Sequence, residues 1–162
     1  LHGGDGNTIL GSANFVKRSI EINRHGNRNR ERFTIAHEIG HFSMGHDRYL
    51  RSETIVKRDL IADLDKEDNF NYERLEYQAN IFASALLLPE EQFRFEVEAM
   101  RRHLGVYDRG FGYIFVDDQP CNYTPYNQIL MELSDYFCVS KQAIEIRLKR
   151  AGLVTDKRRK NH

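Results

Sequence analysis

Two histidines and a glutamate within five residues have the types and spacing for metal chemistry. In the segment RFTIAHEIGHFSMGH, residues 32–46, His37 and His41 are four positions apart and Glu38 follows the first of them. On a helix, residues four apart lie on one face about one turn apart, so both imidazoles could bind one cation. Imidazole is a common zinc ligand, and catalytic zinc sites use three protein ligands and keep one position open.

Glu38 has the position of a general base in this pattern. It lies roughly 100° further round the helix than His37, where its carboxylate can reach a water on the metal without being a ligand. Zinc lowers the pKa of such a water, and the carboxylate can take its proton as the oxygen attacks a carbonyl. The HExxH pattern therefore predicts peptide hydrolysis, although a helix can also carry His, Glu and His by chance.

The helix that must position these residues is predicted from Arg30 to about Met44, with Asn29 as its N-cap and Gly45 at its end. Its remaining residues are mostly apolar, so we expect it to be buried on most sides. These apolar residues are Phe33, Ile35, Ala36, Ile39 and Phe42. Gly40 costs about 1 kcal/mol relative to alanine inside a helix, which suggests that another backbone approaches closely there.

A second helix, capped by Asn71 and closed by Pro89, is predicted to supply the third ligand. One of its faces carries Glu76, Ala79, Asn80 and Ala83. A single carboxylate beside small residues suits a helix packed closely on the first, so Glu76 is the predicted ligand. Its rival Glu73 is better explained as a first-turn acid favoured by the helix dipole. Asn80 could hydrogen-bond a ligand or be a buried packing amide.

The blocks RFTIAHEIGH and ExxANxFAxxLLxP closely resemble the ImmA/IrrE metallopeptidases. The resemblance places His37, His41 and Glu76 on the zinc ligands of that family. It places Glu38 on the catalytic glutamate. It implies an α+β fold, a mostly helical, gluzincin-like core with a small sheet. It also implies a zinc-dependent endopeptidase of narrow specificity. The expected substrate is a helix-turn-helix transcriptional repressor of a mobile element or a stress response, or a similar regulatory protein.

The rest of the chain is predicted to complete one domain of 162 residues. A core of about residues 1–95 precedes a turn-rich segment, about 101–125, that matches no motif. A helix-turn-helix-like segment of about 126–154 and a basic tail, 155–162, follow. Strand-like runs are expected at Thr8–Phe15, Val16–Asn23 and Tyr113–Val116, a third helix at Glu90–Leu104, and a charged loop with some helix at Asp47–Asn69. That loop could partly cover the site.

The segment ELSDYFCVSKQAIEIRLKRAGLV, residues 132–154, has the pattern of a helix-turn-helix with Ser140 as an N-cap. Its second helix would expose Lys141, Gln142, Glu145 and Lys149 to DNA. Residues 141–162 are also rich in lysine and arginine. The alternative function is therefore a non-proteolytic regulator that binds DNA or a repressor, with zinc structural or sensory. An ordinary helical hairpin packed on the core is the favoured interpretation.

Composition and the remaining titratable residues add weaker expectations. Lysine plus arginine and aspartate plus glutamate number 24 each, and no apolar run reaches the roughly 20 residues that span a bilayer. Two isolated cysteines, Cys121 and Cys138, favour a reducing cytoplasm. His46 could hydrogen-bond a ligand, but a helix-end histidine that interacts with the helix dipole is the favoured interpretation, and His25 and His103 are expected at the surface. The oxyanion donor is left open among His103, Tyr113, Tyr123 and Tyr126.

Overall fold

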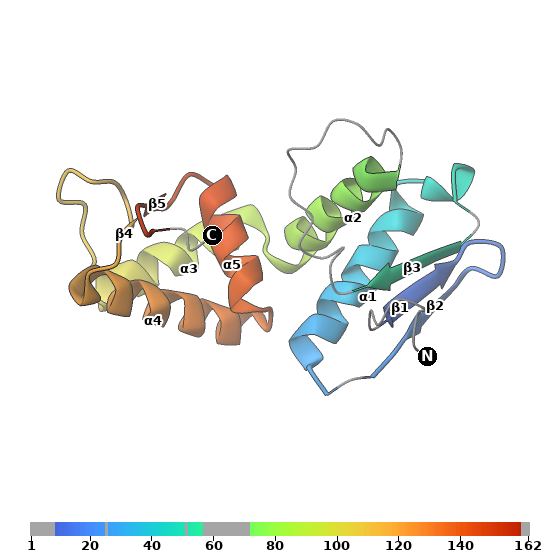
Figure 1. The fold of residues 1–162 in the computed structure, drawn as a ribbon, viewed down its shortest axis with the longest axis horizontal. Helices are drawn as coiled ribbons and strands as arrows, with labels where there is room; N and C mark the ends of the chain where they lie inside the picture. The colour runs from blue at the N-terminus through green and yellow to red at the C-terminus, as the bar shows by residue number, and fades with distance from the viewer. Residues whose placement is uncertain (1–8, 25, 51, 57–71, 160–162) are drawn as a thin grey trace. The chain divides into compact units, whose positions relative to one another are not determined.

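The computed structural model describes residues 9–24, 26–50, 52–56 and 72–159 (Figure 1). It confirms a mostly helical α+β fold with small sheets. The chain divides into two compact units, Leu1–Leu87 and Leu88–His162. That the two units form one domain stays a prediction. Across the part of the chain that the structure describes, each helix is too short or too polar to span a bilayer.

A three-stranded antiparallel sheet begins the first unit, in the order β2-β1-β3. Its strands are β1 (Ile9–Asn14), β2 (Ser19–Ile22) and β3 (Ser52–Val56). The first two confirm the predicted strand-like runs. The third lies where the sequence predicts a loop with some helix, because its backbone pairs with β1 along its length. The described part of that loop also contains the short 3-10 helix η1 (His46–Arg48), and residues 57–69 lie outside the described residues.

Helix α1 (Arg28–Ser43) packs against β1 and carries the HExxH pattern. Its N-cap is Asn27 rather than the predicted Asn29, and the Asn27 side chain accepts a hydrogen bond from the Arg30 amide at 3.1 Å. The helix ends at Ser43, Met44 is its C-cap, and Gly45 follows with φ of 70°. Glycine adopts this left-handed conformation without the strain that a Cβ would bring, so the chain can turn sharply there.

Helix α1 is buried on one face rather than on most sides, and that face is largely polar. Ile35 and Ile39 expose 41% and 36% of their surface. The buried residues of the helix are Thr34, Ala36, His37, Glu38, Gly40 and His41. The prediction of burial on most sides is therefore wrong for the isoleucines. Burying polar side chains is unfavourable unless they find partners. The orientation of α1 therefore indicates that its buried polar residues interact with other groups.

Helix α2 (Tyr72–Leu87) lies directly against α1, as the sequence predicts (Figure 1). A Cβ added to Gly40 would lie 3.2 Å from both Cα and the carbonyl oxygen of Ala79, and 3.2 Å from Cβ of Phe82. The close backbone approach expected at Gly40 is confirmed. Glu76, Ala79 and Ala83 are buried on the predicted face. The predicted cap residue Asn71 lies outside the described residues.

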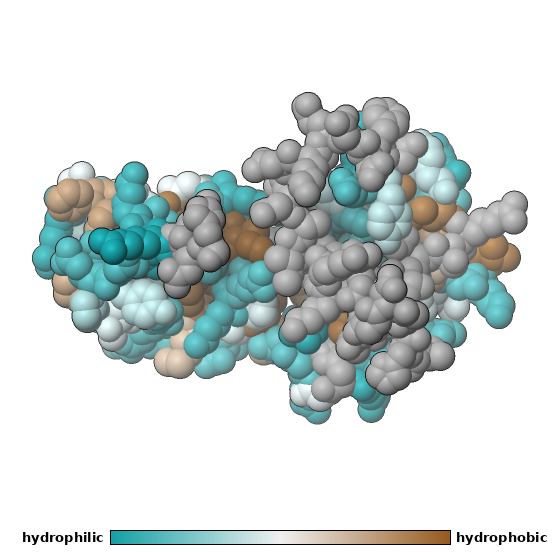
Figure 2. All heavy atoms as spheres, in the orientation of Figure 1, coloured by the Kyte–Doolittle hydropathy of each residue, from teal (hydrophilic) through white to brown (hydrophobic). Residues whose placement is uncertain are grey.

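Three helices and a pair of short strands form the second unit. They are α3 (Glu90–His103), β4 (Phe115–Val116), α4 (Pro120–Phe137), α5 (Lys141–Arg150) and β5 (Thr155–Asp156), and β4 and β5 are parallel. Fully buried side chains of the three helices make the core: Phe93, Val97, Ile129, Leu133, Ile144 and Leu148. Figure 2 shows mainly hydrophilic residues over the part of this unit that faces the viewer, with smaller apolar patches.

The start of α4 and the presence of β5 differ from the sequence prediction. Helix α4 begins at Pro120, six residues before the predicted start, and continues through Pro125. Proline is well suited to the first turn of a helix, and burial of Tyr126 favours continuation despite Pro125. The hairpin itself is as predicted, because the Ser140 hydroxyl accepts a hydrogen bond from the Ala143 amide at 3.1 Å. Strand β5 was not predicted.

Charged residues of α5 pair with the segment that follows it. Lys149 Nζ lies 3.2 Å from Glu145 and 3.1 Å from Asp156, and Arg158 pairs with both of these carboxylates. Two of the four residues expected on a DNA-reading face, Glu145 and Lys149, are therefore engaged within the unit. This pairing favours the interpretation of α4 and α5 as an ordinary hairpin.

Acid should weaken the second unit through Asp156. Its hydrogen bonds and ion pairs with Arg158 and Lys149 lower the pKa of Asp156 below its usual value. A carboxylate with a lowered pKa in the folded state stabilises that state above the unfolded pKa, near 4, and this contribution is lost as pH falls further. We expect Asp156→Asn to lower the free energy of unfolding by about 1 kcal/mol at pH 7. The deficit should shrink toward pH 3, as measured by urea unfolding followed by circular dichroism; a deficit independent of pH would contradict this.

Candidate metal centre

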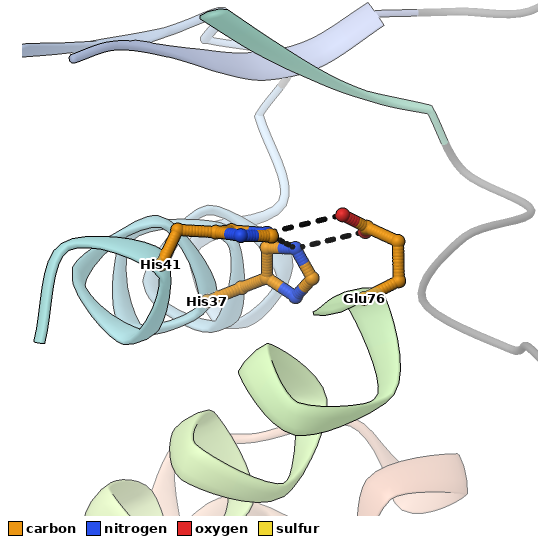
Figure 3. Close-up of side chains that lie close together, drawn as sticks. All are labelled: His37, His41 and Glu76. Atoms are coloured by element: carbon orange, nitrogen blue, oxygen red, sulfur yellow. Dashed lines mark hydrogen bonds and ion pairs between the residues drawn. The ribbon is translucent and has the colours of Figure 1, made fainter. Parts of the chain in front are cut away.

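His37, His41 and Glu76 come together between α1 and α2 (Figure 3). The Nε2 atoms of the two histidines lie 2.9 Å apart. Each is 3.1 Å from one carboxylate oxygen of Glu76. The histidines are fully buried and Glu76 is 2% exposed. Helical spacing aligns the histidines, and the Gly40 contact brings α2 near enough for Glu76 to reach them.

The donor atoms of this cluster fit a divalent metal ion. Within the described residues, neither buried oxygen of Glu76 accepts a hydrogen bond. Ligand atoms placed tetrahedrally about 2.0–2.1 Å from a zinc ion lie about 3.3 Å from one another. The separations of 2.9 and 3.1 Å are close to that value. Two imidazoles and a carboxylate are also ligand types that zinc accepts. The three side chains could therefore hold a metal.

The electrostatics of the cluster favour an ionised carboxylate. Burial alone would raise the pKa of Glu76, but its interactions with His37 and His41 outweigh burial and lower that pKa to about 2. For His37, burial acts to lower the pKa, while Glu76 and then Glu38 act to raise it, and the net pKa is raised. The site thus has a marked preference for positive charge beside Glu76, which a cation would satisfy.

Asn80 orients His37. Its Oδ1 lies 2.9 Å from His37 Nδ1, and because a carbonyl oxygen only accepts, the Nδ1–H group must donate. The other ring nitrogen, Nε2, then faces Glu76. Of the two roles that the sequence leaves open for Asn80, the structure agrees with the first, since Asn80 hydrogen-bonds to the predicted ligand His37. A partner of this kind fixes the ring and its tautomer.

His46 differs from the expectation of a helix-end residue that interacts only with the dipole. It is 2% exposed, and its Nδ1 lies 2.8 Å from His41 Nδ1. Burial, and then the charge of His41, lower the pKa of His46. Hydrogen bonding to a predicted ligand is the less favoured of the two roles expected for His46, because a spacing of five residues is not a helical contact distance. The contact arises because Gly45 turns the chain after α1.

Glu38 is buried in α1, and Glu73 is exposed in the first turn of α2. Glu38 follows His37 directly in α1, and its charge is among the interactions that raise the pKa of His37. That it acts as the base stays a prediction. The exposure of Glu73 agrees with a solvated acid and leaves Glu76 as the carboxylate that faces the histidines.

The four oxyanion candidates all belong to the second unit. The Tyr113 hydroxyl donates to Glu98, and the Tyr126 hydroxyl donates to Glu145 at 3.2 Å. His103 and Tyr123 are exposed. The choice among these four stays a prediction. His25, expected at the surface, lies outside the described residues.

Comparison with known protein families gives a match over residues 4–149. The matching model is that of the IrrE N-terminal-like domain, a peptidase family. A search of curated proteins found no match. The matched range contains both helices of the cluster and most of the second unit.

Proposed function

Because this chain belongs to the peptidase family of the IrrE N-terminal-like domain, we propose that it is a zinc-dependent endopeptidase. The proposed metal ligands are His37, His41 and Glu76. The observation that carries the proposal is the buried cluster itself, in which two imidazole nitrogens and a carboxylate face one another within hydrogen-bonding distance. A peptidase family implies a protein substrate.

The proposed mechanism assigns the proton transfers to Glu38. Zinc, when bound, supplies Lewis acidity, which polarises the scissile carbonyl and makes water more acidic. Glu38 takes the proton of the attacking water and later gives it to the leaving amine. Its burial beside His37 supports this role, because a carboxylate shielded from bulk water exchanges its proton with the substrate rather than with solvent.

The proposed substrate is a helix-turn-helix transcriptional repressor or a similar regulatory protein, held in an extended conformation. Support for the substrate class comes from the family resemblance. Support for the conformation comes from β2, which is an edge of the three-stranded sheet in the described residues. An edge strand can pair with an extended peptide through main-chain hydrogen bonds. A cytoplasmic location, as expected from the two isolated cysteines, fits such a substrate.

Metal content tests the proposed ligands. We expect about one zinc per chain in wild-type protein, and loss of that zinc in both His37→Ala and Glu76→Ala, because two remaining ligands bind zinc weakly. The measurement is mass-spectrometric metal analysis of protein purified without added metal. Glu73→Ala is the matched control, since it removes an exposed glutamate from the same helix, and it should keep its zinc. Wild-type protein that stays free of metal when zinc is supplied would refute the proposal.

A further inference from the structure

We propose that His46, supported by Gln78, is a positioning residue that fixes the tautomer and orientation of His41. The inference rests on the proposed function, in which His41 offers Nε2 to a metal. It adds a residue that the HExxH pattern does not contain and that reaches the site through the turn after α1.

Two contacts join these side chains in a row. His46 Nδ1 lies 2.8 Å from His41 Nδ1, and His46 Nε2 lies 3.1 Å from Gln78 Oε1. The rings of His41 and His46 meet edge to face, with centroids 4.9 Å apart. Both imidazoles are almost completely buried, so the hydrogen bonds between them compete little with water.

The direction of hydrogen bonding along the row follows from the chemistry of its ends. Gln78 Oε1 is a carbonyl oxygen, so His46 Nε2–H donates to it. A neutral His46 then has a lone pair on Nδ1, which accepts from His41 Nδ1–H. His41 is left with its lone pair on Nε2, the atom that faces His37 and Glu76. That is the tautomer a metal ligand requires.

The reverse direction would disable the site. If the amide group of Gln78 donated to His46 Nε2, then His46 Nδ1–H would donate to His41 Nδ1. The proton of His41 would move to Nε2, into the space between the proposed ligands, and Nε2 could no longer bind a cation. The row therefore couples the tautomer of His41 to the orientation of the Gln78 amide, and the orientation with Oε1 toward His46 corresponds to the competent tautomer.

The surrounding backbone holds His46 in place. Gly45, at φ of 70°, reverses the chain after α1, and the amides of Tyr49 and Leu50 donate to the His46 carbonyl at 2.9 Å each. Helix α2 carries the proposed ligand Glu76 and two hydrogen-bond acceptors. Asn80 accepts from His37, and Gln78 accepts from His46, which in turn contacts His41. His37 is thus oriented directly by a residue of α2, and His41 is oriented by a residue of α2 through His46.

The test compares two substitutions of His46. His46→Asn keeps an oxygen acceptor near the position of Nδ1, whereas His46→Leu removes the acceptor. We expect His46→Leu to weaken zinc binding by about 10- to 100-fold in chelator competition, and His46→Asn to recover most of that loss. Phe15→Leu is the matched control, because Phe15 is buried against the same imidazole without hydrogen-bonding to it, and its zinc affinity should be unchanged.

Nitrogen-15 NMR of the imidazoles in metal-free protein supplies a second readout that does not depend on zinc. The wild-type spectrum should show His41 protonated on Nδ1, and His46→Leu should populate the Nε2–H tautomer. A wild-type His41 protonated only on Nε2, or a His46→Leu variant with wild-type zinc affinity and tautomer, would overturn the inference while leaving the proposed function intact. Wild-type protein that binds no zinc would refute the proposed function, and the metal-free spectrum would still decide the tautomer.

Discussion

Glu38→Gln should leave the zinc content and the fold unchanged and lower the rate of substrate cleavage by about 10²- to 10⁴-fold, the usual contribution of a general base. Glutamine has nearly the same shape as glutamate, so the buried site can accommodate it, but its amide cannot take a proton from water. Because Glu38 is not a proposed ligand, the metal should remain. Cleavage would be measured with a panel of purified helix-turn-helix repressors, using mass spectrometry to find shortened products.

Glu73→Gln is the control for this prediction, since it makes the same change at an exposed position of α2. It should cleave at the wild-type rate. If Glu38→Gln retained zinc and cut a wild-type substrate at an undiminished rate, Glu38 could not be the base and another group would have to carry the proton. Loss of zinc in Glu38→Gln would instead mean that Glu38 helps to hold the metal.

Gly40→Val should destabilise the first unit by about 3 kcal/mol, because even a single added carbon would meet the backbone of Ala79 at 3.2 Å. The neighbouring atoms are main chain rather than flexible side-chain ends, so relief requires α1 and α2 to separate. Separation would also move Glu76 away from the histidines and weaken zinc binding. Urea unfolding in the presence of a chelator measures the first effect, and chelator competition measures the second.

Ile39→Val is the matched control, because it places the same side chain at the adjacent, partly exposed position of α1. It should change neither stability nor zinc affinity appreciably. A Gly40→Val protein with wild-type stability would show that the helices can adjust to the added volume. In that case the absence of a side chain at Gly40 would not be what sets the distance between Glu76 and the two histidines.

The parts of the site that helical periodicity governs could be predicted from the sequence. The spacing of four residues is enough to align His37 with His41. On α2, the face with small residues beside Glu76 favours Glu76 rather than Glu73 as the predicted third ligand. The energetic disadvantage of Gly40 inside a helix indicated the close contact that the structure contains. In each case the helical pattern of the sequence agrees with the packing of α1 on α2. Helical periodicity and residue size are therefore sufficient to predict these features.

Other features that depend on partners far away in the sequence were not predicted or were not the favoured interpretation. Strand β3 exists because β1 pairs with it, although the two are about 40 residues apart in the sequence. His46 reaches His41 through a left-handed glycine, which breaks the helical spacing on which the pattern depends. The exposure of Ile35 and Ile39 has a related cause. The polar face of α1 turned inward, which left apolar residues on the outside.

The proposed metal ligands lie on two separate helices, and this has a consequence for the stability of the folded chain. Residues 44–71 separate α1 from α2 in the sequence, so an ion bound to both helices closes a long loop and acts as a reversible cross-link. Since the unfolded chain lacks this arrangement, ion binding adds directly to folding free energy, by about 2.7 kcal/mol at a free metal concentration one hundred times Kd. The lifetime of the protein against proteolysis would then follow the supply of metal, whether or not a substrate is present.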